Sequence, residues 1–241
     1  MEKLRQILDE MIATLENADE FRERLENLVS VYPFNEYEYI ISTLLGLNKL
    51  TLDAYVELRD DYIARNLYLY IFEISAPRKF GETWAQGHLK ALVPDLVKPQ
   101  KKLDPQYSGQ YDFFLDGRIK IEVKASRAVD FDSDASLYEK ALSSDSDKQF
   151  DMNFQQIKPA CCDVFVWVAV WRDRIRYWVL SSREVETNRY FSTGQHRGNV
   201  GEGQLHLNRD NIQDFSQYEC RSDGLLDAIR NAYVRQREGD A

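Results

Sequence analysis

The most apolar run in the chain extends from Cys161 to Trp171, and it limits the folds that the chain can adopt. Valine, phenylalanine, tryptophan and alanine follow one another here, without the alternation of a strand that has one solvated face. We therefore expect a central β-strand that is buried on both faces. Residues 172–174 are polar and should turn the chain back into an antiparallel partner strand, residues 175–180.

Residues 107–127 predict a β-hairpin. An Asp-Gly pair at positions 116–117, the strongest short-range hairpin signal, separates an apolar run from residues 118–124, in which apolar and charged side chains alternate. Because successive side chains of a strand point to opposite faces, Glu122 and Lys124 are expected side by side on the charged face.

The position of Asp112 depends on the length of the turn. A two-residue turn would place Asp112 opposite Ile121, on the apolar face of the hairpin. A three-residue turn made of Leu115–Gly117, with the glycine in a left-handed conformation, would place Asp112 opposite Lys120 and therefore on the charged face. A catalytic role for Asp112 thus requires an odd loop, a bulge or a bend at this turn.

Two carboxylates and a lysine on one strand face suit metal-dependent cleavage of a phosphodiester. Mg²⁺ prefers hard oxygen ligands, which the carboxylates of Asp112 and Glu122 and the carbonyl of Val123 could supply. The ammonium group of Lys124 could hold the attacking water or stabilise charge that develops in the transition state. We therefore expect Mg²⁺ as the cofactor.

Asp112, followed after nine intervening residues by Glu122-Val123-Lys124, resembles the motif of the PD-(D/E)xK nuclease superfamily, which includes many type II restriction endonucleases. The resemblance covers about residues 77–215, and Tyr111 stands where the motif has a proline. It implies an α/β fold in which helices flank a restriction-endonuclease-like mixed central sheet. It also implies Mg²⁺ dependence and hydrolysis of double-stranded DNA.

The same resemblance implies two further features. In many members of the superfamily an acidic residue on a preceding helix reaches the metal, which makes Glu82 a candidate. A helix and an apolar strand follow the motif strand in the family, and residues 152–158 and 162–171 look like these two elements. The catalytic candidates are therefore Asp112, Glu122, Lys124 and Glu82, and the metal-binding candidates are Asp112, Glu122 and Val123.

The net charge of -9 conceals a local basic excess. Residues 74–127 hold 10 Lys and Arg against 6 Asp and Glu, whereas residues 1–73 hold 7 against 15. A phosphate-binding surface needs local positive charge and not a basic total, so double-stranded DNA remains a suitable partner. The DNA contacts expected around the hairpin are Arg78, Lys79, Lys101, Lys102, Ser126 and Arg127.

Two polar segments near the second half of the sheet could read base edges, because Arg and Asn side chains pair with guanine and adenine. The same segments are equally compatible with plain surface loops, and the sequence leaves both interpretations open. Their candidate DNA-binding residues are Gln195, His196, Arg197, Asn199, Asn208 and Arg209.

Two parts of the chain are expected, a helical N-terminal subdomain at residues 1–75 and a nuclease core with DNA-recognition loops at residues 76–241. Apolar residues recur at helical spacing in the first part, with a break near residues 17–19. Asn35 and Thr51 are expected to cap two of its helices, the second of which would extend to about Ile74. This subdomain could serve packing, dimerisation or bracing.

The core is completed by elements that the sequence predicts after the hairpin. A surface loop at residues 128–151 should contain a short helix at residues 135–142. A serine at 181 or 182 should cap a short helix, and residues 204–207 should form a short strand. Ser222 should cap a last amphipathic helix, residues 225–235.

We expect a cytoplasmic protein that does not enter a membrane. No apolar run approaches the length of a transmembrane helix, and Met-Glu-Lys-Leu-Arg-Gln opens an amphipathic helix and not a signal peptide. Three cysteines without a Cys-x-x-Cys spacing indicate reduced thiols and no zinc site.

The favoured function is that of a Mg²⁺-dependent type II restriction endonuclease, which would act as a homodimer because a palindromic site calls for twofold symmetry. One alternative is a repair, recombination or transposition nuclease of the same superfamily. The other is a DNA-binding or assembly module that keeps the fold without catalysis.

Overall fold

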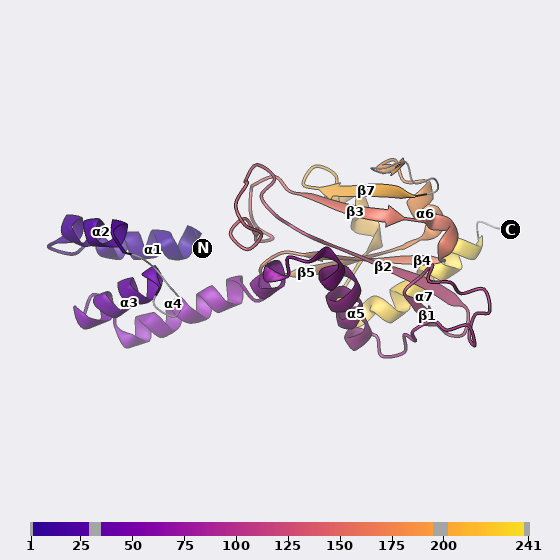
Figure 1. Cartoon of the computed structure of the whole chain (residues 1–241), viewed down its shortest axis with the longest axis horizontal. Coiled ribbons are helices and arrows are strands. Elements are labelled where there is room, and N and C mark those ends of the chain that lie inside the picture. The colour runs from indigo at the N-terminus through magenta and orange to yellow at the C-terminus, as the bar shows by residue number, and fades with distance from the viewer. Residues whose placement is uncertain (1, 29–34, 195–201, 239–241) are drawn as a thin grey trace. The chain divides into compact units, whose positions relative to one another are not determined.

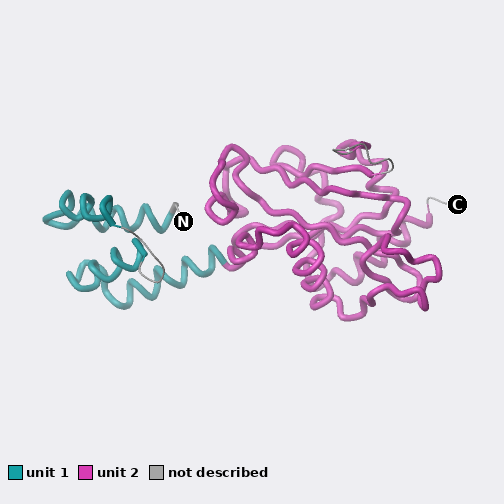
Figure 2. Tube along the Cα trace, in the orientation of Figure 1, with its two compact units in different colours: residues 1–66 teal, residues 67–241 magenta. Residues whose placement is uncertain are grey.

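The computed structural model describes residues 2–28, 35–194 and 202–238, which belong to two units (Figure 2). The first unit comprises residues 1–66 and the second comprises residues 67–241. Residues 67–75 therefore group with the second unit and not with the N-terminal helices. The reason is burial, because Ile71 and Phe72 of a short 3-10 helix, Leu69–Glu73 (η1), lie in the core of the second unit.

The first unit consists of helices whose apolar faces meet in a small core. These helices are α1 (Glu2–Ile12), α2 (Ala18–Glu26), α3 (Glu36–Gly46) and α4 (Leu52–Arg65). The expected break falls between α1 and α2 and is confirmed. The core contains Leu8, Ile12, Leu15, Phe21, Ile40, Leu44 and Leu50.

Both expected helix caps are present in this unit. The side chain of Asn35 accepts a hydrogen bond of 2.9 Å from the amide of Glu38, and Thr51 accepts one of 3.1 Å from the amide of Ala54. The prediction that the helix after Thr51 continues to Ile74 is wrong, because α4 ends at Arg65. Asn66 ends it, since its side-chain amide binds the carbonyl of Tyr62 at 2.7 Å.

The second unit is an α/β structure built on a mixed five-stranded sheet in the order β1-β2-β4-β5-β8. Strands β2 and β4 are parallel, and the other neighbouring pairs are antiparallel. Every residue of the central strand β4 is buried, which confirms the expectation drawn from the apolar run. The strands are β1 (Phe113–Leu115), β2 (Ile119–Arg127), β4 (Val164–Val170), β5 (Ile175–Ser181) and β8 (Glu219–Cys220).

Different layers cover the two faces of this sheet (Figure 1). Helices α5 (Gln86–Leu92) and α7 (Leu225–Glu238) pack on one face, and α5 continues directly from a π-helical segment, Lys79–Ala85 (η2). A three-stranded sheet in the order β3-β7-β6 packs on the other face. Its strands are β3 (Asp151–Ile157), β7 (Gly203–Asn208) and β6 (Phe191–Thr193).

Two helices predicted between β2 and β4 are absent. Residues 135–142 contain turns, and residues 152–158 lie mainly in strand β3. Buried Met152 and Phe154 alternate with the half-buried Asp151 and Asn153, which is the period of a strand. Phe154 stacks on Trp167 of β4 with ring centroids 5.0 Å apart, so β3 is held by the core that β4 creates.

The remaining predicted elements are close to those expected. Ser181 caps α6 (Ser182–Glu186) in a capping box with Glu184. Short 3-10 helices occupy Pro159–Cys161 (η3), Ile212–Tyr218 (η4) and Ser222–Gly224 (η5). Ser222 was expected to cap the last helix, but it begins η5, which directly precedes α7. Within the described ranges, no helix combines the length and the apolar character that crossing a lipid bilayer would require.

The hairpin has the odd turn that a role for Asp112 requires. Phe113 pairs with Ile121 and Leu115 with Ile119, which leaves Asp116–Arg118 as the loop instead of Leu115–Gly117. Asp116 and Gly117 both have positive φ, +52° and +66°, as the twist of a tight hairpin demands. The amide of Asp112 donates to the carbonyl of Ile121 at 2.9 Å, which holds this residue at the end of the ladder, level with Glu122.

Gly117→Ala is expected to lower the free energy of unfolding by about 1–2 kcal/mol, because a residue with a Cβ atom is strained at positive φ. Gly224→Ala is the matched control. An added Cβ atom meets nothing within 4 Å at either position, and of the two only Gly117 has a positive φ. Urea denaturation followed by tryptophan fluorescence measures both, and equal effects would contradict the importance of the turn.

Candidate functional site

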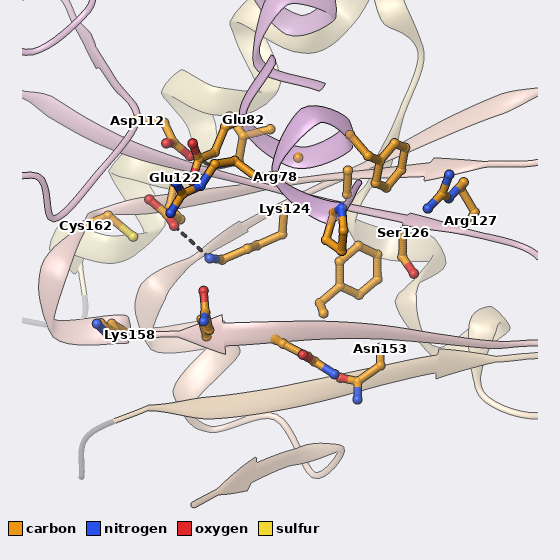
Figure 3. Close-up of a pocket in the computed structure, with 18 of the residues that line it drawn as sticks. Arg78, Glu82, Asp112, Glu122, Lys124, Ser126, Arg127, Asn153, Lys158 and Cys162 are labelled. Atoms are coloured by element: carbon orange, nitrogen blue, oxygen red, sulfur yellow. Dashed lines mark hydrogen bonds and ion pairs between the residues drawn. The ribbon is translucent and has the colours of Figure 1, made fainter. Parts of the chain in front are cut away.

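The charged face of β2 opens into a cleft of about 1010 Å³ within the second unit (Figure 3). One part of its lining comes from η2 and the residues just before β1, and another comes from β2 itself. The third part is β3, which lies against β2. Asp112, Glu122 and Lys124 all line this cleft, so the structure brings the three principal candidates together.

Glu122 and Lys124 form an ion pair on β2. The distance from Lys124 Nζ to Glu122 Oε1 is 2.8 Å, and the side chains are only 16% and 18% exposed, respectively. Apolar neighbours on the same strand, Ile121 and Val123, point into the helix-covered core and keep the strand regular. The periodicity of β2 is therefore the direct reason that these two charges share one face.

Asp112 is held by one hydrogen bond on each carboxylate oxygen. Oδ2 accepts from the backbone amide of Val123 at 2.8 Å, and Oδ1 accepts from Gln86 Nε2 at 2.5 Å. Gln86 lies at the start of α5, and its own Oε1 accepts from Lys98 Nζ. Because a lysine can only donate, this contact fixes which end of the Gln86 amide faces Asp112.

Both carboxyl groups of the site have raised pKa values. Burial is the main cause of the raised pKa of Asp112. Burial is also the main cause at Glu122, where the nearby charge of Asp112 adds to it and the attraction of Lys124 opposes it, with a resulting pKa of about 7. A site in which two acids resist ionisation together favours an added cation.

The donors present fit a hard divalent cation. Among the described residues, no three His, Cys, Asp or Glu side chains gather at one point, so a metal here would take two carboxylates and complete its shell with other oxygens. The amide of Val123 points to Asp112. Since the N–H and C=O groups of a strand residue point to the same side, the Val123 carbonyl faces the Asp112 edge and could add a ligand.

Glu82 lies on η2 and lines the same cleft, but its contacts are with solvent and with Arg78. The Arg78 Nε to Glu82 Oε1 distance is 3.3 Å, and these side chains are 83% and 61% exposed, respectively. The helical residue that touches Asp112 is Gln86 and not Glu82. Glu82 is thus available at the mouth of the cleft without being part of the hydrogen-bonded group.

The residues expected to bind DNA around the hairpin lie in different settings. Arg78, Ser126 and Arg127 line the cleft, whereas Lys79, Lys101 and Lys102 are exposed and do not line it.

Arg127 holds η1 against β2. Its Nη1 donates to the carbonyls of Ile71 and Ile74 at 3.1 and 2.8 Å, and its guanidinium lies over the ring of Phe80. The pKa of Arg127 is lowered by burial. Its position in the structure is therefore that of a structural cation at one end of the cleft.

The two polar recognition segments are described only in part. Gln195, His196, Arg197 and Asn199 lie outside the described residues. The carbonyl oxygen of the Asn208 side chain accepts hydrogen bonds of 3.1 Å from the amides of Asp210 and Asn211. Arg209 donates to the carbonyl of Ser146 and to Asp147, the latter at 2.8 Å, so both described residues make internal contacts.

The sequence did not single out Gln86, and it misplaced the β3 wall. Gln86 precedes the buried Leu89 by three residues on α5, so a polar residue on an apolar helix face was the available signal. Asn153, Gln155, Gln156 and Lys158 line the cleft from the β3 side. From the sequence alone, Gln155 and Gln156 could support the site or simply cap a helix and face solvent, and the second interpretation is favoured; the structure places both on the wall of the cleft.

Glu122→Gln is expected to flatten the dependence of stability on pH and to stabilise the fold above neutral pH. Folding raises the pKa of this carboxyl from an ordinary 4.5 to about 7. The folded state therefore holds an extra proton between these values and loses stability as pH rises through them. The expected gain above that window is at most roughly 3 kcal/mol, measured by urea denaturation across pH.

Asp116→Asn provides a control of opposite sign. Arg230, with its Nε 2.8 Å from Asp116, holds the pKa of that carboxyl below its usual value, so this contribution is lost as pH falls. Asparagine tolerates the positive φ of this position. If both substitutions changed the pH slope of the free energy of unfolding in the same direction, the account of the paired carboxylates would be wrong.

Added Mg²⁺ should stabilise the wild-type chain more than the Glu122→Gln chain.

Gln86→Met is expected to lower the free energy of unfolding by about 1–3 kcal/mol, because a partly buried carboxylate oxygen and Lys98 both lose their partner. Gln213→Met serves as a control at an exposed glutamine on η4, where a change within about 0.5 kcal/mol is expected. Urea denaturation compares the two, and a Gln86 variant as stable as the control would show that the contact is dispensable.

No family model matches the chain, and no curated protein does so either. The function of the cleft has to follow from its own residues, which are a pair of carboxylates with raised pKa values, a lysine bonded to one of them and an amide bonded to the other.

Proposed function

We propose that the chain is a Mg²⁺-dependent endonuclease of the PD-(D/E)xK type that hydrolyses double-stranded DNA at a specific sequence. The observation that carries this proposal is the convergence of Asp112, Glu122 and Lys124 in one cleft, which depends on the odd hairpin turn. Alternating charges along an exposed strand face would not by themselves bring the carboxylate of Asp112 beside that of Glu122.

The side chains have separate roles in this proposal. Asp112 and Glu122 bind the divalent cation, and Gln86 and the Val123 amide hold Asp112 in a fixed orientation. The cation, when bound, neutralises charge on the phosphate and lowers the pKa of water. Lys124 orients the attacking water or stabilises the charge that develops on the phosphate oxygens. Its contact with Glu122 keeps it beside the metal position.

Double-stranded DNA suits the chemistry around the site. Part of the cleft lining comes from the segment that has the local basic excess, and Arg78 and Lys124 are among its residues there. Basic side chains beside a pair of metal-binding acids fit a phosphodiester, which needs both charge neutralisation and positioning. Two copies of the chain would place two such sites on a palindrome, so we include a homodimer in the proposal.

A restriction-endonuclease-like fold is part of the same proposal. In its support, helices pack on one face of the mixed sheet, and the hairpin strand β2 has an apolar parallel neighbour, β4. One feature departs from the family pattern. The segment that connects β2 to β4 carries strand β3 and a single 3-10 turn, η3, where a helix was expected.

Lys124→Ala and Asp112→Ala are each expected to abolish Mg²⁺-dependent cleavage of plasmid DNA, with a loss of at least about a hundredfold in rate. Lys120→Ala is the matched control. Lys120 lies on the same strand, does not line the cleft, and is bound to Asp104 at 2.9 Å. Agarose gels measure cleavage, and circular dichroism checks that each variant folds. Activity that survives both site substitutions would refute the assignment.

The products separate this proposal from its alternatives. Discrete fragments from plasmid or genomic DNA support a site-specific endonuclease. A preference for branched DNA over linear duplex would favour a repair, recombination or transposition nuclease of the same superfamily. Binding of DNA without cleavage at any Mg²⁺ concentration would favour a module without catalysis.

A further inference from the structure

Strand β3 contains a bulge at the point where it lines the cleft. Phe154 pairs with Leu205 of β7, and Ile157 pairs with Gly203, so two residues of β3 lie opposite the single residue Gln204. The two residues of the bulge are Gln155 and Gln156, and both line the cleft. Bulges of this kind often re-aim side chains beside functional sites.

The bulge places two consecutive amide side chains outside the core. A regular strand would send Gln155 and Gln156 to opposite faces, because successive side chains alternate. Here both are exposed, and Ile157 returns to the core. Gln156 has a φ of +55°, a conformation that is unfavourable for a residue with a Cβ atom. The fold therefore accepts local strain in order to present both amides.

These amides are free to bind another molecule. Neither Gln155 nor Gln156 has a side-chain hydrogen bond to any residue in the described part of the chain. Their neighbours on the same wall are already engaged: Asn153 donates to Gln204 at 3.2 Å, and Lys158 forms an ion pair with Glu202 at 2.7 Å. Figure 3 shows Asn153 and Lys158 on the β3 side of the cleft, with Glu122 and Lys124 on the β2 side.

An unpaired glutamine amide matches one kind of nucleic-acid group best. It offers a donor and an acceptor side by side, as adenine does at N7 and N6 in the major groove. Guanine presents two acceptors there and is matched by arginine or lysine. A phosphate offers only acceptors, so it would use the donor of a glutamine amide and leave the amide oxygen without a partner. The amides therefore suit a base edge better than the DNA backbone.

We propose that Gln155 and Gln156 are the base-reading contact of the cleft and select an A·T pair through the major-groove edge of adenine. The inference rests on the proposed function, since it takes duplex DNA as the substrate. It adds that the two walls of the cleft have different roles: residues on β2 cleave the backbone, and the bulge of β3 selects the sequence.

Selection of bound duplexes from a random library tests this inference without cleavage. The full chain with Glu122→Gln is used in Mg²⁺, because this change removes one buried charge and a metal ligand. We expect it to enrich duplexes that carry an A·T pair at a fixed position. Adding Gln155→Ala or Gln156→Gly should reduce the preference for that pair by about tenfold. Adding Gln213→Ala, at an exposed glutamine on η4 away from the cleft, should leave it unchanged.

Two variants at position 156 separate recognition from folding. Gln156→Gly keeps a residue that accepts positive φ, so its thermal midpoint should equal or exceed that of the parent while the A·T preference is lost. Gln156→Asn keeps an amide at the bulge and should retain more of the preference than glycine does.

The inference is overturned if no sequence is enriched, if the enriched position is G·C, or if the A·T preference survives both substitutions. Cleavage of the enriched duplex by the wild-type chain is measured separately. If the duplex is bound selectively but never cut, the proposed nuclease activity fails and the base-reading contact stands. If DNA is cut without any sequence preference, the nuclease activity stands and the base-reading contact fails.

Discussion

Asp112 and Glu122 place two carboxyl groups side by side in a partly buried position, and contacts from β2 and α5 hold them there. Burial raises the pKa of both groups. Three contacts offset the cost, from Lys124 to Glu122, and from the Val123 amide and Gln86 to Asp112. These groups come from β2 and α5, which pack on the same core, and the hairpin turn sets the register that brings Asp112 level with them.

The second sheet forms the wall of the cleft that lies opposite these carboxyl groups. A helix in the connection from β2 to β4 would present side chains at intervals of three and four residues, whereas β3 is a strand that lies along the charged face of β2. Strand β3 is held there by Phe154 against Trp167, and by its pairing with β7. The apolar run of β4 thus has two consequences. It fixes the central sheet, and it supplies the large buried surface on which a second sheet can pack.

The parts of the site that could be predicted are those governed by local periodicity. The shared face of Glu122 and Lys124 follows from strand alternation. The side of Asp112 depends on the parity of the turn, which the sequence leaves open; the loop is Asp116–Arg118, one residue later than the three-residue alternative. Gln86 could not be assigned, because its contact with Asp112 depends on how α5 packs against the hairpin. Strand β3 was mistaken for a helix, because seven residues with an inserted bulge interrupt the alternation that identifies a strand.

Backbone strain marks which irregularities of the fold are unusual. Among the described residues other than glycine, positive φ occurs at Asn48, Asp116 and Gln156. Asparagine and aspartate tolerate this conformation, and Asp116 occupies a hairpin turn that requires it. Neither reason applies to Gln156. Its side chain is longer than that of asparagine or aspartate, and it lies in a strand that could have paired with β7 without a bulge. The strain therefore lies at the one position where the chain turns an inward-facing side chain toward the cleft, which is the physical argument for a ligand contact at this wall.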